Sequence, residues 1–201
     1  MADVEDLAGM LVAIAAGDRA LVRAALDAAP SLVTSRLARQ DEFFIAECAA
    51  QVYEGATALH AAAFAYDVET ARELVSRGAA VRARDRRGAE PLHAAASGVP
   101  GAPHWNPVSQ AAVIEYLVDA GADPDAAALG RVTPLHRAVR NRCSAAVGAL
   151  LRAGADPRSP TGRGSTASDL ARRPTGRGGA GSAAAKLEQR IILSLLGEAT
   201  A

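Results

Sequence analysis

Apolar residues recur at helical spacing in a series of short segments along the chain. In the segments 68–75 and 113–118 they lie three or four positions apart, with polar residues between them. This spacing places the apolar side chains on one face of a helix. Because a short helix with one apolar face needs a neighbour to cover it, the pattern predicts helices that stack against one another.

Two short motifs repeat in step along the same segments. His60 and His93 of the first motif lie 33 residues apart, and His136 follows 43 residues after His93. The second motif begins with a glycine and repeats at steps of 43 and 33. The residues of the two motifs are Thr57, Leu59, His60, Leu92, His93, Thr133, Pro134, Leu135 and His136, and Gly78, Gly121 and Gly154. Two motifs in phase predict one structural unit that is repeated.

The chemistry of the motifs fits the two ends of a helix pair. A threonine such as Thr57 or Thr133 can cap the start of the first helix, where Pro134 also fits because a missing N–H costs nothing there. A glycine after the second helix can adopt the left-handed conformation that ends a helix. These residues resemble the ankyrin repeat, with its Thr-Pro-Leu-His opening, its Gly-Ala-Asp closing and its period of 33. The resemblance implies an all-α solenoid of about five helix-turn-helix units with short β-hairpin fingers.

The repeats predict a single ankyrin-repeat domain over residues 1–201. Residues 7–33 and 164–201 keep the helical pattern with little or none of the first motif, so we interpret them as the N-terminal and C-terminal cap units. The internal boundaries that the motifs predict are an inserted segment 34–54, a repeat 55–87, a repeat 88–129 with an inserted loop 97–107, and a repeat 130–163.

Three segments depart from a plain array. For residues 41–52 the apolar pattern predicts an extra helix, whose Phe43 and Phe44 either cover the core or contact a partner. The loop 97–107 holds the only tryptophan, Trp105, which either folds back on its own repeat or anchors a partner. The glycine-rich segment 173–182 is predicted to be a flexible loop, because no strand precedes it and no Gly-Lys-Ser/Thr follows, as a phosphate loop requires.

Composition and charge narrow the class of protein. Hydrophobic residues make up 50% of the chain but aromatic residues only 3%, which favours closely packed short helices over a sheet sandwich. The formal net charge is zero, so any attraction to a polyanion has to come from a local patch. The acidic start of the chain and the lack of a long apolar stretch predict no secretory signal and no membrane span. With two distant cysteines, this predicts a cytoplasmic protein with two buried free thiols, and the alanine and arginine content suggests a bacterial source.

No catalytic, cofactor or metal site is predicted. The three motif histidines occupy equivalent positions in stacked helices, roughly 8 to 10 Å apart, whereas zinc ligands must approach the metal to about 2.1 Å. In the ankyrin family this histidine ties neighbouring fingers together, so His60, His93 and His136 are expected to be structural. No nucleophile motif occurs in the sequence. We therefore expect a protein that is not an enzyme and needs no cofactor.

The resemblance implies that a partner binds the concave face, which the finger tips and the exposed sides of the first helices form. Counted from the motif, the candidate positions are Tyr53, Phe64, Arg86, Arg87, Arg131, Arg140, Asn141 and Arg163, with Trp105 added from the inserted loop. Arg131, like Tyr66, stands where the family usually has glycine. Most of these residues are arginines, whereas the second helices carry acids such as Glu69, Glu73, Glu115 and Asp119, which predicts a basic groove and an acidic back.

Arginine guanidinium groups match the geometry of carboxylates and phosphates, so the leading hypothesis is a monomeric module that binds an acidic segment of another protein. One alternative is that the finger arginines are solvated or paired with neighbouring acids such as Asp85. A second is binding of nucleic acid by the same arginines, which the scarcity of aromatic residues in the groove makes unlikely. A third is self-association through an exposed end of the array.

Overall fold

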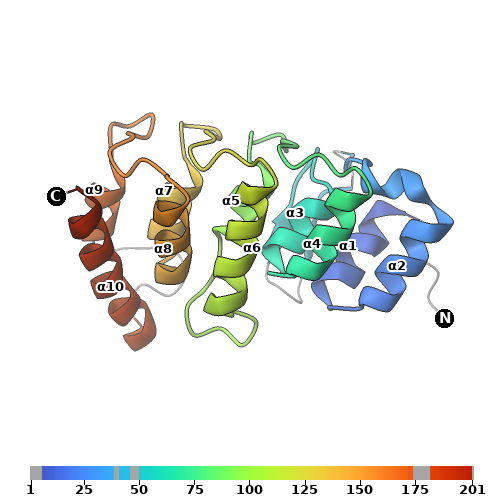
Figure 1. The fold of residues 1–201 in the computed structure, drawn as a ribbon, viewed down its shortest axis with the longest axis horizontal. Coiled ribbons are helices and arrows are strands. Elements are labelled where there is room, and N and C mark those ends of the chain that lie inside the picture. Colours follow the sequence, from blue (N-terminus) through green and yellow to red (C-terminus); the bar gives the residue numbers. More distant parts are fainter. Residues whose placement is uncertain (1–5, 39–40, 46–49, 174–181, 201) are drawn as a thin grey trace.

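The computed structural model describes residues 6–38, 41–45, 50–173 and 182–200. Within these residues the chain forms five helix pairs arranged in a row from the N-terminal to the C-terminal end (Figure 1). Each pair has an inner, first helix and a second helix packed against it. Successive first helices contact one another, and so do the second helices of the last four pairs, so the fold is an all-α solenoid.

The first helices begin at side chains that cap their N-termini. Asp6 and Thr133 accept hydrogen bonds from backbone N–H groups of the first turn, and Pro91 and Pro134 occupy the first helical position. These side chains satisfy N–H groups that have no partner within the helix. The first helices are α1 (Leu7–Ala15), α3 (Ala58–Phe64), α5 (Pro91–Ala95), α7 (Pro134–Arg140) and α9 (Ala167–Arg172).

Each second helix is longer than the first helix of its pair, and three of the second helices end on a glycine. Gly78, Gly121 and Gly154 follow three of them with φ values of 100°, 100° and 89°, the left-handed conformation that the sequence predicted. The second helices are α2 (Arg19–Ala28), α4 (Val68–Ser76), α6 (Pro107–Asp119), α8 (Ser144–Arg152) and α10 (Ala183–Thr200), and a short 3-10 helix, η1 (Pro30–Val33), follows α2.

The predicted helix over residues 41–52 was wrong. Two strands, β1 (Phe43–Ile45) and β2 (Ala50–Val52), pair antiparallel there, with Phe43 opposite Val52. Burial alternates along β1, because Ile45 is buried and Phe44 is 59% exposed, whereas Phe43 packs partly against the core. This alternation is the period of a strand, and aromatic and β-branched residues favour it. Phe43 thus covers the core and Phe44 faces solvent.

The core is built from small and branched side chains. The motif residues Leu59, Leu92 and Leu135 are buried, surrounded by alanines of neighbouring helices. Small side chains let short helices approach closely, and the leucines fill the space that remains. Cys143 is a buried free thiol, and burial raises its pKa to about 12. Cys48 and most of the glycine-rich segment 173–182 lie outside the described residues.

Two residues that join the helices of a pair adopt the left-handed conformation without being glycine. Tyr66 and Arg142 have φ values of 57° and 62° and are almost fully buried. The Tyr66 hydroxyl donates to the Ser97 carbonyl oxygen at 2.5 Å, and the Arg142 guanidinium donates to the carbonyls of Ala171 and Arg173. Each side chain therefore binds the end of the next first helix, which offsets the strain of its backbone.

No helix among the described residues is both long enough and apolar enough to span a bilayer.

Candidate binding groove

The turns that join successive helix pairs form a row of fingers. Backbone hydrogen bonds link neighbouring fingers, from Arg86 N–H to Glu54, from Leu129 N–H to Arg87 and from Gly162 N–H to Gly130, with N to O distances of 2.7 to 2.8 Å. Because each finger is fixed to the next, the side chains at their tips have defined positions relative to one another. This row and the first helices beneath it frame the groove.

The motif histidines fix the fingers to the first helices. The backbone N–H groups of Thr57, Glu90 and Thr133 donate to Nδ1 of the histidine three residues later, at 3.1 to 3.2 Å. Since Nδ1 accepts, Nε2 carries the proton, and it lies 3.1 Å from the Ala89 carbonyl in His60 and 3.0 Å from the Val132 carbonyl in His93. The histidines are thus neutral, structural hydrogen-bonding groups.

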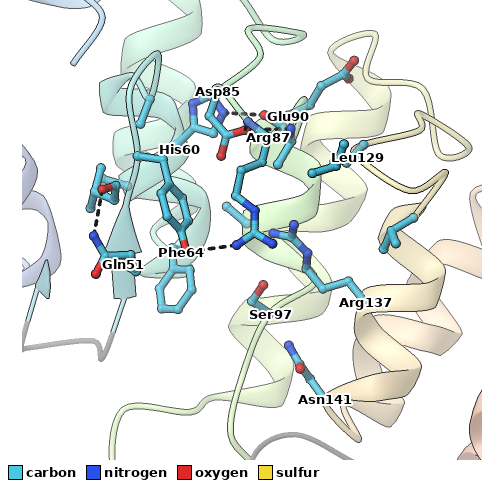
Figure 2. A pocket seen from close by; sticks show the side chains of 18 of the residues that line it. Gln51, His60, Phe64, Asp85, Arg87, Glu90, Ser97, Leu129, Arg137 and Asn141 are labelled. Atoms are coloured by element: carbon cyan, nitrogen blue, oxygen red, sulfur yellow. Dashed lines mark hydrogen bonds between the residues drawn. The ribbon is translucent and has the colours of Figure 1, made fainter. Parts of the chain in front are cut away.

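A cavity of about 270 Å³ lies where three fingers meet α3, α5 and α7 (Figure 2). We call it the central pocket. One part of its lining is apolar and the other part is cationic. The lining residues on which the following paragraphs depend are Tyr53, Phe64, Arg87, Leu129, Arg137, Arg140 and Asn141.

The apolar part of the pocket is unusually accessible. Phe64 at the end of α3 and Val132 of the third finger are partly buried, whereas Leu129 at the tip of that finger is 73% exposed. An exposed leucine and a phenylalanine that line the same pocket offer apolar surface that a bound molecule can cover. The pocket therefore suits a ligand that has an apolar part.

The cationic part centres on Arg137 of α7. Its Nη1 donates to the His93 carbonyl oxygen at 3.2 Å. The pKa of Arg137 is lowered to about 10, mainly by burial; Asp85 raises it, and the positive charges of Arg87 and Arg140 lower it. A guanidinium held in this way remains charged at neutral pH, but its charge is poorly compensated.

The two acids of the central pocket are engaged elsewhere. The Asp85 carboxylate accepts the backbone N–H groups of Arg87 and Ala89 at 2.8 and 2.9 Å within its own finger. The buried Glu90 carboxylate pairs with Arg84 at 3.1 Å. Neither of them forms an ion pair with Arg87 or Arg137 within the described part of the chain.

Tyr53 contacts both arginines of the second finger. The guanidinium groups of Arg86 and Arg87 lie over its ring, 4.9 and 5.1 Å from the ring centre, and Arg87 Nη1 donates to the Tyr53 hydroxyl at 3.0 Å. Arg86 also forms a two-point ion pair with Glu42, which raises the pKa of Arg86. The charge of Arg86 is therefore compensated inside the protein.

The structure brings five of the nine sequence-predicted site residues into the central pocket: Tyr53, Phe64, Arg87, Arg140 and Asn141. The others lie apart from it. Arg163 lines an adjoining hollow of about 710 Å³. Arg131 is exposed in the third finger, with a φ of 55°. Arg86 is held by Glu42, and Trp105 packs on its own helix pair, where its Nε1 donates to Gln110 Oε1 at 3.0 Å.

The sequence analysis missed Arg137. It follows the motif histidine directly, and the equivalent positions in the two preceding units are Ala61 and Ala94. Aligning the repeats on their histidines would have revealed an arginine where an apolar residue is usual in this chain.

The outer face of the array is mixed in charge, so the predicted acidic back was wrong. Most of its acids pair with arginines, and most of these pairs join one helix pair to the next. The Arg19 to Asp67 and Arg152 to Glu115 pairs have N to O distances of 2.8 and 2.7 Å, and Glu73 accepts from both Arg23 and Arg77. Although burial opposes it, hydrogen bonds from Arg19 and Thr70 lower the pKa of Asp67.

Among the described residues, no group of three or more His, Cys, Asp or Glu side chains could hold a metal ion. Together, the stacked helix pairs and the fingers define a repeat protein with two adjoining hollows, which share Leu129, Val132 and Arg140 in their linings. A family model described as ankyrin repeats in three copies matches residues 10–128, and a second model, of a single ankyrin repeat, matches residues 131–162. The chain belongs to the ankyrin-repeat family. Comparison with curated proteins gave no match.

Proposed function

We propose that this chain is a non-catalytic module that binds an acidic segment of another protein in its concave groove. Ankyrin repeats are generally protein-protein interaction modules, and proteins built from them are typically not catalytic. The observation that carries the proposal is the central pocket, in which Arg87 from the second finger and Arg137 and Arg140 from α7 share one cavity with the exposed Leu129 and the partly buried Phe64. Arginine with nearby apolar surface is the composition typical of binding hot spots.

The ion pairs inside the protein identify which arginines belong to the proposed site. Arg86 is compensated by Glu42, so the alternative that finger arginines pair with neighbouring acids holds for that residue. Arg87 and Arg137 instead donate hydrogen bonds to uncharged acceptors, the Tyr53 hydroxyl and the His93 backbone carbonyl. Their charges are therefore the part of the groove with most to gain from an acidic partner.

The experiment is affinity capture from nuclease-treated lysate, quantified by mass spectrometry, with the intact protein and two double variants. The groove variant is Arg87→Glu with Arg140→Glu. The control is Lys186→Glu with Arg190→Glu, which makes the same change in net charge at exposed positions of α10. Circular dichroism checks that all three proteins are folded.

We expect the intact protein and the control to capture the same partner and the groove variant to lose it, because reversed charges in the pocket repel an acidic segment. Equal capture by all three proteins would show that the groove is not the binding surface. Capture that depends on omitting the nuclease would favour nucleic acid instead.

We further propose that the protein is a cytoplasmic monomer from a bacterium, and that the domain spans residues 1–201 with the unit boundaries given above. The compensated charges on the outer face support a monomer, because they leave little unpaired charge there for another copy. Light scattering across a range of concentrations tests this, since a mass that rises with concentration would contradict it.

A further inference from the structure

The guanidinium groups of Arg87 and Arg137 meet inside the central pocket. Arg87 reaches into it from the finger above and Arg137 from α7 at the side, and both side chains end in the middle of the cavity (Figure 2). The two residues come from different repeats, 50 positions apart in the sequence. Two like charges brought together in a partly enclosed site repel each other, and an anion bound between them offsets this repulsion by attracting both.

Each guanidinium has donors to spare. Arg87 uses Nη1 for the Tyr53 hydroxyl, and Arg137 uses Nη1 for the His93 carbonyl. A guanidinium has five N–H donors in a planar arrangement, so both groups keep N–H bonds for a further acceptor. The acceptors that the two arginines already have are neutral, and they anchor the side chains without balancing their charge.

No carboxylate among the described residues forms an ion pair with Arg87 or Arg137. Of the two acids that line the pocket, Glu90 pairs with Arg84. Asp85 accepts two backbone N–H groups through Oδ1, and its charge raises the pKa of Arg137 without a hydrogen bond to that side chain. The arginines are therefore preorganised, and a bound carboxylate would not first have to break an internal ion pair.

The rest of the lining selects among anions. Phe64 and Leu129 provide apolar surface close to the arginines. Removing a phosphate dianion from water into such surroundings costs more than removing a carboxylate monoanion, whose two oxygens suffice for two guanidinium groups. An apolar group next to the carboxylate would cover the exposed leucine.

We propose that the central pocket receives the side-chain carboxylate of an aspartate or glutamate of a partner protein, held between Arg87 and Arg137, with a neighbouring apolar side chain of the same segment against Phe64 and Leu129. This inference rests on the proposed function and makes it more specific, because it names the chemical group that the groove recognises.

The probe that tests it is 3-phenylpropanoate, which carries a carboxylate close to an apolar ring, compared with its neutral analogue 3-phenylpropanamide. Binding to the intact protein is followed by NMR through the backbone amide shifts of Arg87, Leu129 and Arg137. A ligand of this size is expected to bind with a dissociation constant on the order of a few millimolar. The carboxylate is expected to bind about tenfold more tightly than the amide, because its hydrogen bonds to arginine are charge-assisted.

Two variants test the arginine itself. Arg137→Ala places at this position the residue that Ala61 and Ala94 supply in the preceding units, so the fold is expected to tolerate it. It should abolish the preference for the carboxylate over the amide. Arg163→Ala removes an exposed groove arginine outside the central pocket and should keep the preference. If Arg137→Ala does not fold, Arg87→Ala at the finger tip is the variant to use, with the same expectation.

Several results would overturn the inference. These are equal binding of the acid and the amide, no binding of either at 20-fold the expected constant, shifts confined to another part of the chain, or a preference that survives Arg137→Ala. Tighter binding of phenyl phosphate than of the carboxylate would reassign the pocket to a phosphorylated side chain.

The two proposals fail in different ways. If the carboxylate binds at the pocket but the groove variant still captures its partner, the pocket recognises acids and the partner binds elsewhere. If the carboxylate does not bind but the groove variant loses the partner, the groove is the binding surface and its chemistry is not recognition of a carboxylate.

Discussion

At the scale of single residues, the motif histidines perform the same task in successive repeats. His60, His93 and His136 each accept a backbone N–H at the start of a first helix, and His60 and His93 also lie against a carbonyl of the following finger. A neutral imidazole is needed for both bonds at once, since Nδ1 must be free to accept. Burial lowers the pKa of all three, in His93 from 6.5 to about 3.

These lowered values predict that the protein loses stability in mild acid. Because the folded-state pKa lies below the ordinary 6.5, the unfolded chain binds more protons below that pH, and acid therefore favours unfolding. Each histidine contributes up to about 1.4 kcal/mol per pH unit once the pH is well below 6.5. Around pH 5, His93 should therefore lower the free energy of unfolding by about 1.4 kcal/mol per pH unit, and His60 and His136 act in the same direction. Urea unfolding at pH 7.5, 6.5, 5.5 and 4.5 measures this.

The control is His93→Asn, whose amide oxygen can accept the same backbone N–H. The variant is less stable at every pH. Between pH 6.5 and 5, however, its free energy of unfolding should fall less steeply than that of the intact protein, because one proton fewer is taken up on unfolding. The carboxyl groups with lowered pKa values, such as Asp67, titrate below this window. A free energy of unfolding that stays constant from pH 7.5 to 5 would contradict the assignment of neutral, buried histidines.

At the scale of elements, the two helix pairs with inserted loops are joined by the same kind of hydrogen bond, from a glutamine of the second helix to the end of the first. The loop after α5 leaves the last carbonyls of that helix without helical partners, and the Gln110 side chain of α6 donates to Ala95 and Ser97 at 2.9 and 3.0 Å. The Gln189 side chain of α10 does the same for Ala171 and Arg173 at the end of α9. A glutamine from the second helix thus closes the end of the first.

Gln110→Leu is expected to destabilise the protein by about 3 kcal/mol. The change removes the partner of the buried Ala95 carbonyl and that of the partly buried Trp105 N–H, and each unsatisfied group costs roughly 1 to 3 kcal/mol. Urea unfolding gives the free energy. The fluorescence of Trp105, the only tryptophan, should move to longer wavelength as its contact with Gln110 is lost.

Gln189→Leu is the matched control for this prediction. Arg142 also donates to the Ala171 and Arg173 carbonyls, so these acceptors keep a partner and the loss should be about 1 kcal/mol or less. Equal losses in the two variants would mean that the glutamines act by packing and not by hydrogen bonding.

Some features of these helix pairs could be predicted from the sequence and others could not. The caps and the glycine turns were predictable, because each depends on residues within one repeat. The structural role of the histidines was implied by the family resemblance, since their second hydrogen bond reaches the following finger. The strands β1 and β2 were mistaken for a helix because only three residues of each are paired, too few for the alternation to stand out from a helical pattern. Gln110 and Gln189 follow loops of different length, so no fixed spacing points to them.

For the candidate site, the family resemblance predicted the positions of Tyr53, Phe64, Arg87, Arg140 and Asn141 along the groove. It did not predict which arginines are compensated, because the ion pair of Arg86 with Glu42 joins two segments that are 44 residues apart. Trp105 was placed among the candidates as a possible anchor, whereas its indole is hydrogen-bonded within its own helix pair. Electrostatic pairing across repeats depends on the fold and not on local sequence.

At the scale of the whole molecule, the solenoid is held together by contacts between neighbours. The main contacts run from α1 to α3, α5, α7 and α9 in turn, and from α4 to α6, α8 and α10. A central helix pair is therefore supported on two sides, whereas α9 and α10 are supported on one side only. In such an array stability is roughly a sum of terms for each repeat and each interface, so the ends can open before the centre.

This arrangement predicts different consequences for two similar core substitutions. Leu92→Ala in α5 and Leu196→Ala in α10 each remove a buried leucine and are expected to cost about 3 kcal/mol. Hydrogen exchange measured by mass spectrometry should rise throughout α3 to α8 in Leu92→Ala, because the central interface is shared by both halves of the array. In Leu196→Ala it should rise about a hundredfold in α9 and α10 alone, since that end opens independently.

The central pocket would then keep its carboxylate binding in Leu196→Ala, because its walls belong to α3, α5 and α7. Faster exchange spread evenly over the whole chain in both variants would instead show that the array unfolds as one cooperative unit.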